Sequence, residues 1–280
     1  MTEESIARLL GRTARGRIER VGPPGVFLAI DSTTILLPNA EVPEGAKVGD
    51  ELDVFVHLDS DDRPITTRRT PAIRLGEVAF LEVVDVAPFG AFVDWGLVKQ
   101  LLVPLAEQTR DIHRGERHAI GLFLDRSGRL AGTMRVTEML RKNPPFAVGD
   151  WVSGEAWRDD PSIGVFVIVE RAYVGLVPRA EPHRLARGEA ARFRVTNVLG
   201  DGKIELSLRG LAHEERDADA EKILAALRAA RPPKIGDASS PETIRATFGL
   251  SKKAFKRAAG ALLKRGLVAI DGEGFFVARL

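Results

Sequence analysis

The sequence predicts a multi-domain, mainly β protein, with three small barrels in tandem followed by an α+β unit. Three observations predict this architecture. One segment pattern recurs three times before Gly210, each copy contains strand-like runs joined by polar turns, and helical periodicity replaces this pattern after Gly210. A chain of 280 residues is also long for one domain, since two to four domains are usual at that length.

The repeat has a recognisable beginning and end. Each copy opens with Gly, a small or branched apolar residue, Phe and another apolar residue, and closes with a Leu-rich tripeptide followed by Pro. The copies span Gly25–Pro38, Gly90–Pro104 and Gly164–Pro178. Three matched segments in the same order indicate that one structural unit is repeated.

Each copy continues in the same way. A Gly followed by an acid comes next, at 49–50, 115–116 and 188–189, and a strand-like run with a polar turn follows it. The turns "SGR" and "GDGK" are typical of hairpins. Five short strands in a unit of about 65 residues suit a small closed barrel.

The C-terminal segment predicts helices and then a hairpin. Ile223, Leu224 and Leu227 form one apolar stripe of a helix. Ser240-Pro241 is typical of a helix start, and Gly249 of its end. A further helix is predicted between Ser251 and Gly266, and "LVAIDGEGFFVARL" then reads as strand, turn and strand. Three helices and a hairpin are the order of a winged helix-turn-helix.

Composition excludes some classes of protein. The chain has no Cys, which rules out disulfides and thiolate metal sites and suits a reducing cytoplasm. The start "MTEESIARLLGRTARG" lacks the apolar run of a secretory signal, and no stretch approaches the roughly 20 apolar residues of a membrane span. We therefore expect a cytoplasmic location without membrane contact. The net charge of +2 is too small to decide for or against nucleic acid.

The stretch "FGAFVDWG" suggests a binding surface. Phe89 and Phe92 would fall on opposite faces of a regular strand, so one ring leaves the core unless Gly90 bends the chain. Single-stranded RNA is held by bases stacked on aromatic rings and by cations along the phosphates. We predict that the two rings form a base platform, with Gly90 and Ala91 leaving the backbone approachable. The alternative is that Phe92 belongs to the core and Phe89 alone is exposed.

These segments resemble known families. The second copy, with "FGAFVDWG", "LLVP" and "LDRSGRL", is similar to an S1 domain, an oligonucleotide-binding barrel. Three such units followed by "SSPETIRATFGLSKKAFKRAAGALLKRGLV" resemble the conserved virulence factor B family of bacteria. The resemblance implies RNA binding by three S1-like OB-fold barrels in tandem and a C-terminal winged helix. The domains would span residues 1–70 (degenerate), 71–143, 144–212 and 213–280.

The resemblance also implies site residues. The RNA face of S1 domains uses two Phe, a His that closes the Leu-rich tripeptide, and an Asp and an Arg four residues apart near the last hairpin. The second copy matches these positions with Phe89, Phe92, Asp125 and Arg129, but has Pro104 in place of the His. The other copies keep fewer: Phe27, Asp59 and Arg63 in the first, and Phe166 and Lys203 in the third. The main RNA site is therefore expected on the second copy.

Other candidates have competing interpretations. Trp95 would extend the platform or pack on its own barrel. A basic helix with no acid between Ser251 and Ile270 would contact phosphates or remain a solvated face; its candidate contacts are Lys252, Lys253, Lys256 and Arg257.

Catalysis has little support in the sequence. The five His are scattered without the spacing of a zinc helix, and the Gly-Lys of "LGDGKI" lacks the rest of a phosphate loop. We therefore expect no enzyme activity, no metal and no cofactor. The predicted function is binding of single-stranded RNA in post-transcriptional regulation. The alternatives are a winged-helix DNA-binding transcriptional regulator and a protein-docking adaptor on the ribosome or on a nuclease of RNA degradation.

Overall fold

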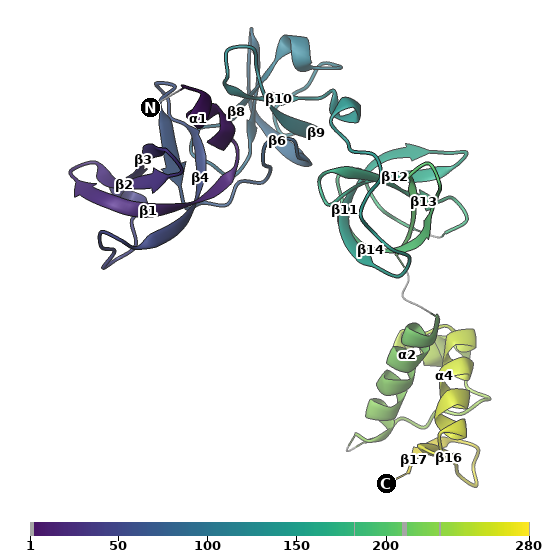
Figure 1. The fold of residues 1–280 in the computed structure, drawn as a ribbon. Helices are drawn as coiled ribbons and strands as arrows, with labels where there is room; N and C mark the ends of the chain where they lie inside the picture. Colours follow the sequence, from purple (N-terminus) through teal and green to yellow (C-terminus); the bar gives the residue numbers. More distant parts are fainter. Residues whose placement is uncertain (1–2, 182, 209–211, 230, 280) are drawn as a thin grey trace. The chain divides into compact units, whose positions relative to one another are not determined.

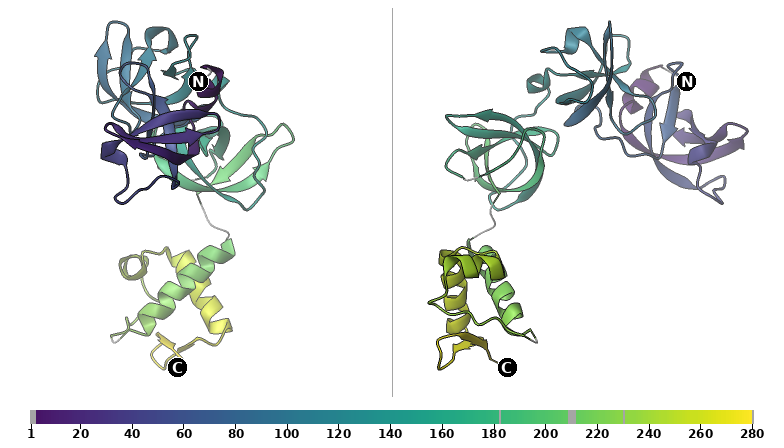
Figure 2. Two further views of the ribbon diagram at one scale, coloured as in Figure 1. Left: turned by 60° about the vertical axis from the view of Figure 1, so that its left-hand side comes forward. Right: turned by 180° about the vertical axis from the view of Figure 1, so that it is seen from behind.

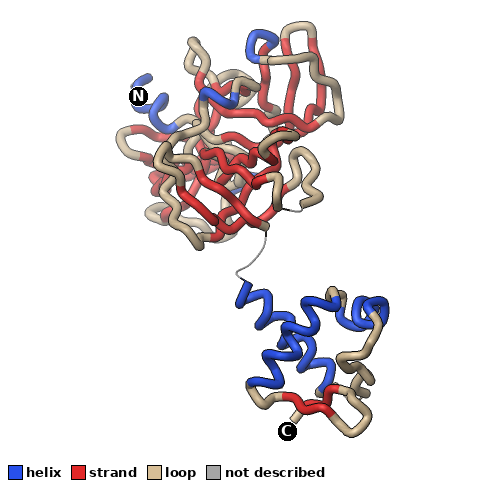
Figure 3. The backbone as a smooth tube through the Cα atoms, turned by 90° about the vertical axis from the view of Figure 1, so that its right-hand side faces the viewer, coloured by secondary structure: helices blue, strands red, loops and turns tan. Residues whose placement is uncertain are grey.

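A computed structural model describes residues 3–181, 183–208, 212–229 and 231–279. The chain divides into two compact units, Met1–Leu208 and Arg209–Leu280. Strands dominate the first unit and helices the second (Figures 1 and 3). The predicted class is confirmed: three five-stranded β-barrels, one of them not fully closed, precede a winged helix.

The first unit contains three copies of one barrel, which follow each other along the chain in Figure 2. Barrel 1 has β1 (Thr13–Gly22), β2 (Gly25–Ile30), β3 (Thr33–Pro38), β4 (Glu51–Leu58) and β5 (Pro64–Thr67). Barrel 2 has β6 (Val78–Ala87), β7 (Gly90–Asp94), β8 (Leu101–Pro104), β9 (Arg117–Leu124) and β10 (Leu130–Thr133). Barrel 3 has β11 (Trp151–Asp160), β12 (Gly164–Val169), β13 (Tyr173–Pro178), β14 (Ala190–Val198) and β15 (Ile204–Ser207).

Closure follows one scheme. Barrel 1 closes in the order β1-β2-β3-β5-β4, and barrel 3 in the order β11-β12-β13-β15-β14. Barrel 2 has the same neighbours in the order β10-β9-β6-β7-β8, and its end strands β8 and β10 lie side by side without forming a ladder. Each barrel encloses its own apolar core, because alternate residues of every strand point inward.

The first strand of each barrel is ten residues long and pairs with two partners. In barrel 1, β1 pairs with β4 through its first half and with β2 through its second. The register between the first two strands shifts in every copy, after Ile18, Val83 and Ala156. Such a bulge bends a strand sharply enough to serve both neighbours of a small barrel.

The repeated Gly at the start of the second strand has a packing role. A Cβ on Gly90 would lie 2.5 Å from the Val103 carbonyl oxygen and 3.0 Å from the Pro104 Cα. Gly25 and Gly164 approach the corresponding backbone of β3 and β13 in the same way. The Gly and the Pro of each repeat are thus opposite residues of one antiparallel pair.

The Gly-acid pair before the fourth strand also has one role in all three barrels. Gly49, Gly115 and Gly188 have positive φ angles, which Gly adopts without steric cost. The acid that follows accepts a hydrogen bond from the backbone N–H three residues before it. These bonds run from Lys47 to Asp50, from His113 to Glu116 and from Ala186 to Glu189.

Several short elements complete the first unit. Helix α1 (Glu3–Leu9), which the sequence analysis did not predict, is followed by Leu10, and Leu9 and Leu10 are buried in the core of barrel 1. Single 3-10 turns are η1 (Asn39–Glu41), η2 (Leu105–Glu107) and η3 (Val136–Glu138).

The second unit contains α2 (Ala212–Leu227), α3 (Pro241–Phe248), α4 (Lys252–Lys264), β16 (Val268–Ile270) and β17 (Phe276–Ala278). The predicted start signals are confirmed, since the Ser240 side chain accepts from the Thr243 N–H and Ser251 from the Ala254 N–H. Gly249 ends α3 with a left-handed φ of 69°. The helices and the hairpin share one core around Phe248 and Phe255.

The predicted domain limits at 70/71 and 143/144 fall between the strands of successive barrels, whereas 212/213 falls in α2, just inside the second unit. In the described part of the chain, every helix is too short or too polar to cross a membrane.

Replacing Gly90 with Ala should destabilise barrel 2, because the new Cβ meets backbone atoms that cannot rotate away. Overpacking of this kind costs roughly 1–3 kcal/mol in the free energy of unfolding. Calorimetric unfolding of the whole chain measures the effect. Gly200→Ala is the matched control, because a Cβ there would have no atom within 4 Å. Equal transition temperatures for the two variants would contradict the packing role of Gly90.

Candidate nucleic-acid interface

The aromatic pair of barrel 2 is divided between surface and wall. Phe89 precedes β7 and is 59% exposed, while Phe92 is half-buried on β7. Their ring centroids lie 6.0 Å apart with an interplanar angle of 89°. Phe89 thus stands edge-on to Phe92, so the pair offers an aromatic surface at a bend in the chain.

The residues between the two rings do not open the backbone. Gly90 and Ala91 are buried, and Ala91 belongs to the core of barrel 2. The expectation that they leave the backbone approachable is wrong, because the missing side chain at Gly90 makes room for β8.

The structure brings the four predicted residues of barrel 2 together. Phe92, Asp125 and Arg129 line one cavity of about 210 Å³, and Phe89 contacts Phe92. Pro104, which stands where the S1 motif has His, lines the same cavity. Strand β7, which contains Phe92, and the hairpin between β9 and β10 therefore line one cavity.

The hairpin between β9 and β10 fixes Arg129. Asp125 Oδ1 accepts from the backbone N–H of Ser127 at 2.8 Å and of Arg129 at 3.0 Å. Arg129 Nε lies 3.7 Å from Asp125 Oδ2 and donates to Ser127 Oγ at 2.9 Å. Desolvation opposes ionisation, but the hydrogen bonds from Ser127 and Arg129 hold the pKa of Asp125 below its usual value. Asp125 is therefore a carboxylate that positions the Arg129 guanidinium.

Barrel 1 contributes residues to this cavity that the sequence analysis missed. Lys99 of barrel 2 donates from Nζ to Asp62 Oδ1 at 3.1 Å and to the Asp59 carbonyl at 2.6 Å. Arg129 Nη1 lies 3.4 Å from Asp62 Oδ2. The hydrogen bond and charge of Lys99, with a smaller contribution from Arg129, lower the pKa of Asp62. The Asp62 carboxylate of barrel 1 thus forms ion pairs with two cations of the barrel 2 cavity, Lys99 and Arg129.

An imidazole is also present at the cavity, although the motif His is absent. His57 of β4 lines the cavity, and its Nδ1 lies 3.2 Å from the Leu58 carbonyl oxygen. Burial lowers the pKa of His57, so the ring is neutral near pH 7 and Nδ1–H donates to that carbonyl. No local signal marks His57, because the contact joins two different repeats.

The corresponding rings of barrels 1 and 3 are covered by cations. The bulge places Arg20 opposite Phe27 and Arg158 opposite Phe166. The guanidinium carbons lie 3.4 Å and 4.6 Å from the respective ring centroids. In barrel 2 the same register position is Asp85, opposite Phe92. A base can therefore reach the barrel 2 ring without displacing a cation–π partner.

The hairpin cations of barrels 1 and 3 are held by neighbouring acids. Arg63 Nη2 lies 2.8 Å from Asp59 and 2.9 Å from Asp61, and Lys203 Nζ lies 2.7 Å from Asp201. These predicted contacts are exposed, but they stand beside covered rings.

Of the two interpretations of Trp95, packing on its own barrel is confirmed and extension of the platform is wrong. Its side chain is 3% exposed, and Nε1 donates to the Lys99 carbonyl at 2.6 Å. The ring packs edge-on against Phe55 of barrel 1 at 5.8 Å between centroids. Trp95 therefore joins two barrels, and although it lines the barrel 2 cavity it is too buried to stack a base.

The basic helix α4 has a mixed surface. Lys253, Lys256 and Arg257 are exposed and Lys252 is half-buried, while Phe255 faces the core. Lys256 Nζ lies 3.0 Å from Asp237, an acid outside the stretch without acids. The exposed cations suit contact with phosphates, whereas the Lys256–Asp237 ion pair suits a solvated face.

Comparison with known proteins supplies the family. Residues 10–69 match the S1 domain family and residues 221–275 the CvfB-like winged helix domain. The S1 match falls on barrel 1, whose aromatic motif is incomplete.

Whole-chain relatives are bacterial. The uncharacterized protein YitL of Bacillus subtilis is 34% identical, over 87% of this chain and 85% of YitL. Conserved virulence factor B of Staphylococcus epidermidis is 28% identical, over 85% and 84%. A crystal structure of a multidomain protein with nucleic acid binding domains from Streptococcus pneumoniae is 25% identical, covers 97% of this chain and 99% of that chain, and has a TM-score of 0.42. The chain therefore belongs to the conserved virulence factor B family, with an S1 domain near its start and a CvfB-like winged helix domain at its end.

Proposed function

We propose that this protein binds single-stranded RNA on barrel 2 and acts in the cytoplasm in post-transcriptional regulation, as a binding protein and not as an enzyme. The observation that carries the proposal is the uncovered aromatic pair Phe89 and Phe92, beside a cavity that contains Arg129 and Lys99. Aromatic faces next to cations suit unpaired bases with their phosphates, and a duplex would keep its bases stacked inside.

The roles follow from the geometry. Phe89, the more exposed ring, stacks a base, and Phe92 forms the wall against which the next base packs. Arg129 meets a phosphate or a base edge, while Asp125 holds the guanidinium in place. Stacking needs no particular base, so sequence preference is modest.

Barrel 1 acts on the same site through Asp62. A phosphate that approaches Lys99 and Arg129 must compete with this carboxylate. The three exposed ion-pair partners are screened by solvent, so the competition weakens binding without preventing it.

The winged helix supports a weaker case for direct contact. Its exposed cations on α4 suit phosphates, but one of them is paired with Asp237. The DNA-binding regulator and the protein-docking adaptor remain the alternative functions, and ribosomal or RNA-degradation proteins remain candidate partners of the adaptor.

Replacing Phe89 with Ala should weaken RNA binding by one stacking contact, on the order of 1–3 kcal/mol or about 5- to 150-fold. Phe89 is exposed, so folding should change little. Fluorescence titration with one RNA oligomer measures the effect, and Phe166→Ala is the matched control, since Arg158 covers that ring. Parental affinity for Phe89→Ala together with weakened binding for Phe166→Ala would move the site to barrel 3.

Replacing Asp62 with Asn should strengthen RNA binding up to about fivefold, the size of one exposed ion pair. The freed cations should also steepen the dependence of log affinity on log salt, by up to about 0.7 for each additional phosphate that they neutralise. Asn suits this position, because Asp62 has a φ of 57° that Asn tolerates well.

Asp61→Asn is the matched control for Asp62, since Asp61 lies in the same turn and pairs with Arg63 of its own barrel. If both variants change affinity and salt dependence equally, Asp62 has no specific effect on the barrel 2 site.

A further inference from the structure

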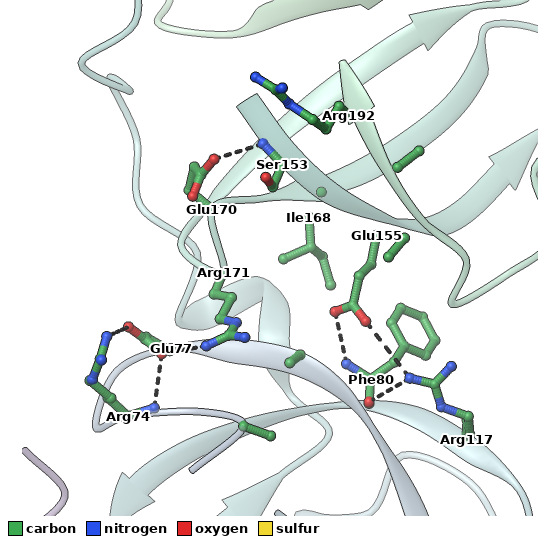
Figure 4. A pocket seen from close by; sticks show the side chains of 15 residues that line it. Arg74, Glu77, Phe80, Arg117, Ser153, Glu155, Ile168, Glu170, Arg171 and Arg192 are labelled. Atoms are coloured by element: carbon green, nitrogen blue, oxygen red, sulfur yellow. Dashed lines mark hydrogen bonds and ion pairs between the residues drawn. The ribbon is translucent and has the colours of Figure 1, made fainter. Parts of the chain in front are cut away.

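Two cavities lie where barrel 2 meets barrel 3, and they differ in how their arginines are paired. The larger, of about 770 Å³, is drawn in Figure 4. Three of the four arginines that line it face glutamates: Glu77 lies 3.6 Å from Arg74 and 3.8 Å from Arg171, and Glu155 lies 3.8 Å from Arg117. Two of these ion pairs, Glu77–Arg171 and Glu155–Arg117, cross between the barrels, so this cavity lies at a contact that joins them. The fourth arginine, Arg192, lies over the Trp151 ring of its own barrel.

Backbone contacts support that interpretation of the larger cavity. Glu155 Oε2 accepts from the Phe80 N–H at 3.0 Å, and Arg117 donates to the Phe80 carbonyl at 3.0 Å (Figure 4). The Val78 N–H donates to the Arg171 carbonyl at 2.7 Å. Barrels 2 and 3 are thus hydrogen-bonded to each other along β6.

In the smaller cavity, of about 360 Å³, the arginines are paired differently. Arg110, in the loop before β9, and Arg187, in the loop before β14, line it together with Arg117. Within the described residues, neither Arg110 nor Arg187 has a carboxylate oxygen within the 4.0 Å of an ion pair. Burial, and then the charge of Arg110, lower the pKa of Arg187, which places the two guanidinium groups in mutual repulsion.

Two acids also line this cavity, Asp111 and Glu116, and Glu116 is already engaged. Glu116 accepts from His118 Nε2 at 2.8 Å and from the His113 backbone N–H at 2.9 Å. Its charge still attracts Arg187 and partly offsets the repulsion from Arg110. In the part of the chain that the structure describes, Arg110 and Arg187, from different barrels, thus line one cavity without forming an ion pair with either of its acids.

Both guanidinium groups are held in position. Arg110 Nη2 lies 3.3 Å from Nδ1 of His118, a buried residue whose pKa burial lowers, so the neutral ring accepts this hydrogen bond. The Arg187 guanidinium carbon lies 5.3 Å from the Phe80 ring centroid, a cation–π contact. Two guanidinium groups that line one cavity and are already held in place can each donate hydrogen bonds to the oxygens of a phosphate.

We propose that Arg110 and Arg187 form a phosphate-binding site at the junction of barrels 2 and 3. The site takes a phosphate of a bound RNA strand or a phosphate of a free nucleotide. The RNA source rests on the function proposed above, and the free-nucleotide source does not. The eight residues of β9, about 26 Å at the usual strand rise, separate this junction from the hairpin of Asp125. An RNA strand that reaches both places passes from barrel 2 to barrel 3.

The first experiment measures the salt dependence of affinity for a 20-nucleotide single-stranded RNA. Arg187→Gln should flatten the slope of log affinity against log salt by about 0.7, and the double variant with Arg110→Gln by about 1.4. Arg184→Gln is the matched control, since Arg184 is exposed in the same loop and does not line the cavity. Arg187→Lys keeps the charge and should keep most of the slope.

The second experiment titrates the parent chain with inorganic pyrophosphate and follows the arginine Nε–Hε signals by NMR. A shift of the Arg187 signal that Arg110→Gln weakens supports the site even if the chain binds no RNA, so failure of the proposed function is distinguished from failure of the site. A flattened RNA slope without a pyrophosphate response assigns the site to RNA phosphates. The proposal is overturned if Arg187→Gln behaves like Arg184→Gln toward RNA and pyrophosphate leaves the Arg187 signal unchanged.

Discussion

The bulge in the first strand of each barrel is the constraint on which both the fold and the site depend. A small barrel needs one strand that bends far enough to pair with two neighbours, and β1, β6 and β11 do so through a register shift at the same place. The residue after the shift faces the Phe of the second strand. Two barrels have Arg there and barrel 2 has Asp85, so one substitution at a structurally required bend decides whether the ring is covered.

Contacts between barrels extend this local difference into a larger surface. Trp95 packs on Phe55, and Asp62 of barrel 1 pairs with the two cations of the barrel 2 cavity. Barrel 2 also meets barrel 3 at two cavities, one in which most arginines form ion pairs with glutamates and a second in which Arg110 and Arg187 form none. The physical difference lies in pairing: neutralised arginines hold barrels together, and arginines without a carboxylate attract anions.

The sequence predicted what local patterns encode. The caps at Ser240 and Ser251, the hairpin at Asp125 and the three repeats are written in neighbouring residues, and the structure has each of them. The sequence did not predict that the Arg20 guanidinium covers the Phe27 ring. The bulge aligns these two residues, and its position cannot be read from sequence spacing. The sequence analysis missed the contact of Trp95 with Phe55 and the ion pairs of Asp62 for a common reason: the partners lie on another barrel, and no local period reports such a contact.

The central claim is that unpaired RNA, and not duplex DNA, is the ligand of this chain. Competition binding of a ten-nucleotide single-stranded RNA, the same single-stranded DNA and a duplex DNA of equal length, at one salt concentration, tests it most directly. The account predicts that the RNA binds better than the duplex, because the Phe89 and Phe92 rings stack bases that a duplex keeps inside. Tighter binding of the duplex would contradict the account and favour a DNA-binding regulator that acts through its winged helix.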